Sequence, residues 1–275
     1  GVAAVGMPYH SEEIHPSFVA FSMGLYISGN SIGGMRVRLL SGVFTDFFNW
    51  RIALAVIGLF ALAAALMFWK ILPASRHFRP MSLRPKTLFI NFRLHWRDKG
   101  LPRLFLTGFL LMGSFVTLFN YIGYRLMLSP WELSQAVVGL LSVAYLTGTW
   151  SSPKAGSMTT RYGRGPVMLF STGVMLVGLL MTLFTSLWLI FAGMLLFSAG
   201  FFAAHSVASS WIGPRAKRAK GQASSLYLFS YYLGSSIAGT LGGVFWHRNG
   251  VGGFIALMLV LALLVGARLH HRLHV

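Results

Sequence analysis

Long uncharged stretches alternate with short basic or polar segments along the whole chain. A bilayer crossing takes about 20 apolar residues, and the chain provides such a length eight times. The pattern therefore predicts eight complete spanning helices, within residues 14–44, 52–69, 104–124, 135–153, 165–214 (two helices, divided near Thr185), 221–246 and 251–267. The opening run GVAAVGMPY is too short to span, and we expect it to be the end of a ninth helix.

Composition agrees with this pattern. Apolar residues make up 55% of the 275 residues and charged residues only 10%, whereas a soluble domain carries about 25% charged residues. The predicted fold class is an all-α polytopic membrane protein. A net charge of +18 would favour a nucleic-acid partner in a soluble protein, but here the charge falls between apolar runs, so we expect no nucleic acid and a lipid bilayer instead.

The basic residues gather in alternate loops. Of the 23 Lys and Arg residues, 18 lie in four segments: nine in 70–103, three in 154–165, four in 215–220 and two in the tail. Lys and Arg mark the cytoplasmic side of a membrane protein. We therefore expect a multi-pass membrane protein with the linker and the C-terminus in the cytoplasm.

One nine-residue pattern occurs twice. Residues 26–34 read YISGNSIGG and residues 231–239 read YYLGSSIAG, which share Y-x-x-G-x-S-I-x-G at an offset of 205 residues. A long-period repeat is typical of duplicated transporter halves, although small residues recur in any packed membrane helix. In either case we expect the motif glycines to pack against neighbouring helices: Gly29, Gly33, Gly34, Gly234 and Gly239.

The repeat also predicts a domain organisation. Residues 1–72 would be the remainder of an N-terminal half, 73–103 a basic cytoplasmic linker, and 104–275 a complete six-helix half. Four predicted helices separate the linker from the second copy, whereas only the short opening run precedes the first. If the halves match, we expect about three and a half further helices before Gly1.

At this point the chain resembles the major facilitator superfamily, whose plan is six helices, a long cytoplasmic linker and six more helices. The family's loop motif G-x-x-x-D-R-x-G-R-R is similar to GSMTTRYGRG at 156–165, in which Gly156, Arg161, Gly163 and Arg164 match. Thr160 stands in place of the acid and Gly165 in place of the last arginine, which puts a charge-locked gate on this side in doubt. The G-P-x-x-G-G motif of drug–proton antiporters is similar to residues 29–34, with Asn30 at the proline position.

The resemblance implies a secondary active transporter of a bacterial inner membrane that works by alternating access. It implies a small organic solute, a drug or a sugar, as the substrate, export as the direction, protons as the coupling ion, and a monomer. The alternative is a non-transporting membrane remnant or a regulatory membrane subunit.

Polar side chains inside predicted spans are candidates for the substrate cavity, because such residues are costly in a membrane. The candidates are Asn30, Asn120, Tyr121, Tyr124, His205 and Tyr231. Interhelical hydrogen bonding explains the asparagines equally well, and a packed, satisfied histidine explains His205.

The sequence gives little support for proton-binding carboxylates within the predicted spans, for enzyme catalysis or for a metal site. The five acids, Glu12, Glu13, Asp46, Asp98 and Glu132, fall in predicted loops, so a coupling carboxylate would precede Gly1 or His205 would titrate instead. Gly29–Gly33 fits G-x-S-x-G but lacks the strand–turn–helix context of a hydrolase. We expect no enzyme activity, no catalytic residue, no cofactor and no metal site.

The charge asymmetry yields a testable topology. Reporter fusions at Pro80, Arg218 and Val275 should all report the cytoplasm, because these positions lie in or beside the basic segments. A periplasmic signal at any two of the three would overturn the orientation.

Overall fold

A computed structural model describes residues 2–76, 84–247 and 250–273, with the side chains at 2–5, 38, 41–43, 45–47, 135–136 and 270–273 left out. Every regular element in these ranges is helical, as predicted. Helices suit a bilayer because they satisfy all their backbone hydrogen bonds internally. The order is α1 (Val2–Glu13), α2 (Val19–Phe47), α3 (Trp50–Ile71), α4 (Pro85–Arg97), α5 (Leu101–Met127), α6 (Gln135–Leu140), a 3₁₀ segment η1 (Leu141–Leu146), α7 (Thr147–Tyr162), α8 (Arg164–Thr182), α9 (Leu187–Arg215), α10 (Lys220–Trp246) and α11 (Val251–Leu273).

Five of the described helices are both long and apolar enough to cross a membrane: α3, α5, α8, α9 and α11. Helices α2 and α10 have 29 and 27 residues, so they have the length, but glycine, serine and tyrosine lower their hydropathy. The predicted span 135–153 is divided among α6, η1 and α7. The predicted number of eight spans therefore stays a prediction.

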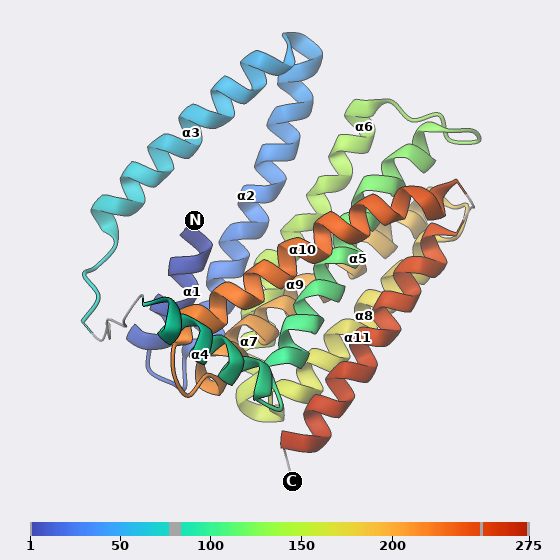
Figure 1. The fold of residues 1–275 in the computed structure, drawn as a ribbon. Coiled ribbons are helices and arrows are strands. Elements are labelled where there is room, and N and C mark those ends of the chain that lie inside the picture. The colour runs from blue at the N-terminus through green and yellow to red at the C-terminus, as the bar shows by residue number, and fades with distance from the viewer. Residues whose placement is uncertain (1, 77–83, 248–249, 274–275) are drawn as a thin grey trace.

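Helices α5 and α7 to α11 form one packed bundle, and the hairpin of α2 and α3 lies along its side (Figure 1). Among the described helices, α3 contacts only α2, and most of its apolar side chains are exposed. The start of α4, the end of α11 and the start of α10 lie at the same end of the bundle (Figure 1). The basic segments therefore meet at one end, as the alternation of loops requires.

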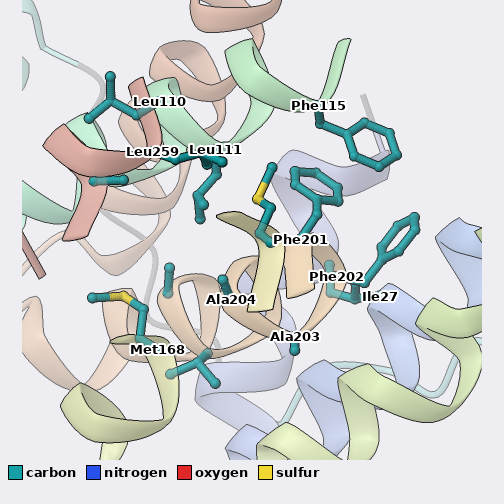
Figure 2. Close-up of a cluster of buried hydrophobic side chains, with 14 of the residues drawn as sticks. Ile27, Leu110, Leu111, Phe115, Met168, Phe201, Phe202, Ala203, Ala204 and Leu259 are labelled. Carbon is teal, nitrogen blue, oxygen red and sulfur yellow. The ribbon is translucent and has the colours of Figure 1, made fainter. Parts of the chain in front are cut away.

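Aromatic side chains fill the centre of the bundle. Phe115 of α5 stacks on Phe201 of α9 with ring centroids 4.0 Å apart and planes 21° apart. Figure 2 shows these rings beside Phe202 and Ile27, so α2 reaches the same cluster as the C-terminal helices. Offset stacking of this kind adds to the effect of burial.

Helices α8 and α9 approach each other closely at small residues. A Cβ added at Gly193 of α9 would lie 2.6 Å from the carbonyl oxygen of Gly178 on α8. A Cβ at Gly200 would lie 2.6 Å from both the backbone nitrogen of Met175 and the carbonyl oxygen of Ser171. Neither position has room for a side chain, so glycine permits this backbone approach.

Helix α2 docks on α7 in the same way. A Cβ at Gly24 would lie 2.6 Å from the carbonyl oxygen of Ser152 and 2.7 Å from the Cα of Pro153. On the other side, Gly156 faces the backbone of Ala20 and Phe21 so closely that any side chain would clash. These small residues join the first part of the chain to the C-terminal bundle.

Three local expectations need correction. The linker contains a regular helix, α4, because Pro85 occupies a first-turn position where proline is tolerated. Asp46 lies in the last turn of α2 rather than in a loop, and Glu12 and Glu13 end α1. All three acids are nevertheless at helix ends.

Close packing of α8 on α9 predicts a sharp difference between two glycines of α8. Gly178→Leu should lower the free energy of unfolding by about 3 kcal/mol or more, because overpacking forces backbones apart. Gly173→Leu is the matched control, since a Cβ there meets no atom within 4 Å. Thermal stability of the detergent-purified protein measures the difference, and equal losses for both variants would contradict this packing.

Candidate functional site

The candidate cavity residues lie on four helices: Asn30 on α2, Asn120, Tyr121 and Tyr124 on α5, His205 on α9, and Tyr231 on α10. The structure divides them into two clusters, one toward the end of α5 and one at the centre of the bundle, with Asn30 apart from both. The sequence did not predict this division.

The first cluster joins the end of α5 to α10. The Tyr121 hydroxyl donates to the carbonyl oxygen of Gly239 over 3.0 Å. The Tyr121 ring lies 5.9 Å from that of Trp246 and 6.1 Å from that of Tyr124. Asn120 is exposed, and its Nδ2 would lie 3.7 Å from a Cβ at Gly239. Tyr121 therefore has a structural bond, whereas Asn120 and Tyr124 present exposed polar groups.

The second cluster is centred on His205, which is only 4% exposed. Its Nδ1 is 2.8 Å from the hydroxyl of Tyr227, and its ring lies 4.6 Å from that of Tyr231. Phe201 stacks on the same imidazole, with planes 5° apart. In this conformation His205 is a packed histidine with a hydrogen-bond partner, the alternative that the sequence left open.

Asn30 is exposed on α2, beside Tyr26 one turn earlier, with which its side chain forms a hydrogen bond. Helix α2 makes no backbone contact with α10 in the described part of the chain. The two copies of the repeated pattern therefore lie on helices whose backbones do not pack against each other.

The motif glycines differ in their surroundings. A Cβ at Gly34 would lie 3.2 Å from the Tyr145 ring, and one at Gly239 would lie 3.4 Å from Val116. Gly234 lies directly against the backbone of Phe109. A Cβ added at Gly29 or Gly33 would meet no neighbouring atom within 4 Å. The expected close approach to another helix is therefore not seen at these two positions.

The loop motif lies between α7 and α8. Gly156 is where α2 docks, and Gly163 adopts a φ of 80°, a left-handed value that favours glycine. Arg161 is in the last turn of α7, where a cation favours the helix dipole. Arg164 begins α8, at the helix end where a cation is disfavoured.

Two sets of residues escaped prediction. Ser28 donates to the carbonyl oxygen of Thr149, and the hydroxyls of Ser31 and Thr149 are 3.5 Å apart, which places polar contacts in the α2–α7 interface. Arg125 donates to the last carbonyl groups at the end of α8, those of Thr182, Leu183 and Phe184. Both sets join segments that are distant in sequence. Only the serine shared by the two copies of the repeated pattern, Ser31, could have indicated a contact from the sequence.

No group of three or more His, Cys, Asp or Glu side chains that could hold a metal ion occurs among the described residues.

Comparison with known proteins gives a family match. The model of the Major Facilitator Superfamily matches residues 1–130 and 104–272. The inner membrane transport protein YnfM of Escherichia coli K12 is 90% identical over 277 residues, which cover 100% of this chain and 66% of that protein. An uncharacterized transporter of Buchnera aphidicola from Schizaphis graminum is 51% identical, covering 98% of this chain and 66% of its own.

A more distant relative is the uncharacterized MFS-type transporter YybF of Bacillus subtilis, 44% identical over 96% of this chain and 66% of its own length. The chain thus spans just under two thirds of the length of each of these three relatives.

The central cluster predicts a measurable coupling. Tyr227→Phe should lower the free energy of unfolding by about 1–3 kcal/mol, because it leaves the buried His205 Nδ1 without its partner. Tyr232→Phe, on the same helix but 54% exposed, is the control. The double variant with His205→Phe should lose less than the sum of the two single losses, and strict additivity in thermal melts would show that the bond contributes nothing.

Proposed function

Because the chain belongs to the major facilitator superfamily, we propose that it is part of a secondary transporter of the inner membrane that moves a small organic solute by alternating access. The proposal extends to a two-half organisation, with residues 1–72 on one side of the linker 73–103 and residues 104–275 on the other. The α2–α7 contact would then join the two halves.

The observation that carries this proposal is the chemistry of the α2–α7 interface. The contact combines glycines with the hydroxyls of Ser28, Ser31 and Thr149 and has no ion pair in the described residues. A small-residue interface with neutral polar contacts can part and rejoin without stranding a buried charge. That property suits two bodies that rock against each other around a central site.

Exposed polar side chains support a solute path. Asn30 on α2 and Asn120 on α5 are both exposed, and an amide that faced lipid would be costly. We propose that these asparagines, with Tyr124, face the solute, while His205 and Tyr231 form the wall behind it. Gly29 and Gly33 would leave space along the same face of α2.

We propose export coupled to protons, with a drug or a sugar as the solute. Support comes from the resemblance of residues 29–34 to the antiporter motif. His205 is the one histidine buried within the aromatic centre of the described bundle, and it is the candidate for proton binding when the solute path opens. We propose a monomer, with α3 facing lipid, and a cytoplasmic linker and C-terminus.

The alternative, a regulatory membrane subunit, makes a different prediction. A regulatory subunit would copurify with a second membrane protein in fixed stoichiometry and would move no solute when purified alone.

The transport test uses two forms of the protein. One is the 275-residue chain, and the other is the chain joined to the part of E. coli YnfM that the 277 matched residues leave out. In proteoliposomes with an imposed proton gradient, the joined form should release protons on addition of its solute from a panel of sugars and cationic drugs. Asn120→Ala should reduce this signal about tenfold or more, because a lost hydrogen bond to a solute is worth about 1.5 kcal/mol.

Gly173→Ala serves as the control, because a Cβ there meets open space. A full panel without any proton signal from the joined form would refute proton-coupled transport. An unchanged proton signal in Asn120→Ala would indicate that Asn120 contributes to helix packing and does not bind the solute.

A further inference from the structure

The linker helix α4 has two different faces. Asn91 and His95 are buried against the bundle, and the amide of Gln222 on α10 donates to the carbonyl oxygen of Leu88 over 2.9 Å. The rest of the helix surface carries exposed aromatic and aliphatic side chains: Phe89, Ile90, Phe92, Leu94 and Trp96. A short helix with aromatic groups and arginines together is typical of a segment that lies in the membrane interface.

The end of α4 is fixed by one carboxylate. Asp98 Oδ1 accepts from the backbone N–H groups of Gly100 and Leu101 at 2.8 and 2.9 Å and from Nε of Arg215 at 2.9 Å. Burial alone would raise the pKa of Asp98, but Arg215 and these N–H groups bring it below its ordinary value. Asp98 is therefore ionised at neutral pH and balances Arg215.

Beside this ion pair lies a pocket of about 240 Å³. Its lining comes from the end of α4, the start of α5 and the segment after α9: Leu94, His95, Arg97, Asp98, Leu101, Arg215, Lys217 and Arg218. Since Asp98 balances Arg215, three cationic side chains remain without a carboxylate among the lining residues. Leu94 and Leu101 add an apolar wall.

His95 supplies an independent observation. The side chain is 2% exposed, and its Nε2 has no hydrogen-bond partner. Burial lowers the pKa of His95, and the opposing effect of a backbone bond to Ala219 and of Asp98 is smaller, so the ring is neutral at neutral pH. The neutral ring thus has a buried nitrogen, Nε2, without a hydrogen-bond partner, in the wall of a cationic pocket.

We propose that this pocket binds an anionic phospholipid whose headgroup carries a free hydroxyl. The phosphate would lie among Arg97, Lys217 and Arg218, a headgroup hydroxyl would donate to Nε2 of His95, and the acyl chains would lie along the apolar face of α4. Basic pockets on the inner side of membrane proteins bind such headgroups. The lipid would then hold the linker against the bundle at the α4–α9–α10 junction.

The test titrates lipids into the detergent-purified chain and reads bound lipid by native mass spectrometry. Phosphatidylglycerol, which has both the phosphate and hydroxyls, should bind more tightly than phosphatidylmethanol, which has the same single negative charge but no headgroup hydroxyl, and far more tightly than zwitterionic phosphatidylcholine. Lys217→Gln with Arg218→Gln should weaken phosphatidylglycerol about tenfold or more, since each basic group near a membrane surface adds roughly a factor of five.

The matched control is Lys70→Gln with Lys154→Gln. It removes the same charge from two exposed lysines of the basic segments that lie outside the pocket, so phosphatidylglycerol affinity should stay within about twofold. His95→Phe should remove the preference for phosphatidylglycerol over phosphatidylmethanol while leaving binding of phosphatidylmethanol in place.

Three outcomes would overturn the proposal. Equal weakening by the pocket and control variants would indicate surface charge alone. Equal binding of phosphatidylcholine would remove the role of the anion. Competition by inorganic phosphate as effective as that by phosphatidylglycerol would assign the pocket to a free anion instead of a lipid. If His95→Phe does not fold, the phosphatidylglycerol affinity of the variant with Lys217→Gln and Arg218→Gln, two exposed residues, still tests the proposal.

Discussion

Close approach of helix backbones at small residues is the contact on which the rest of this structure depends. Within a bilayer the hydrophobic effect does not drive helices together, because lipid is as apolar as a leucine side chain. Packing at Gly178, Gly193 and Gly200 brings α8 and α9 into van der Waals contact. With that pair fixed, the phenyl rings of α5 and α9 stack at the centre of the bundle.

The same kind of contact has a second consequence at α2. Gly24 and Gly156 allow α2 and α7 to meet without bulky interlocking side chains, and neutral hydroxyls complete the contact. Among the described residues, this contact contains no ion pair that would have to break if the two helices part. The linker helix α4 lies at one end of the bundle (Figure 1), where the proposed lipid would connect it to the membrane surface.

Sequence reasoning predicted the helical class and the family, because charge-free length and the Y-x-x-G-x-S-I-x-G repeat are local properties of the chain. It did not predict a helix within the basic linker, where Pro85 begins α4. It could not find the partner of His205, because Tyr227 comes from another helix. It also could not distinguish Gly234, which meets a neighbouring backbone, from Gly29, which meets open space.

Crosslinking across the α2–α7 contact tests the account most directly. The chain has no cysteine, and the hydroxyls of Ser31 and Thr149 are 3.5 Å apart, so these two side chains meet across the contact. In the joined form, Ser31→Cys with Thr149→Cys should form a disulfide on mild oxidation, stop transport, and regain transport on reduction. Asn30→Cys with Thr149→Cys, one residue around the helix, should crosslink poorly. Failure of the Ser31–Thr149 pair to crosslink, or full transport in its oxidised form, would contradict a closed α2–α7 contact that must part during each cycle.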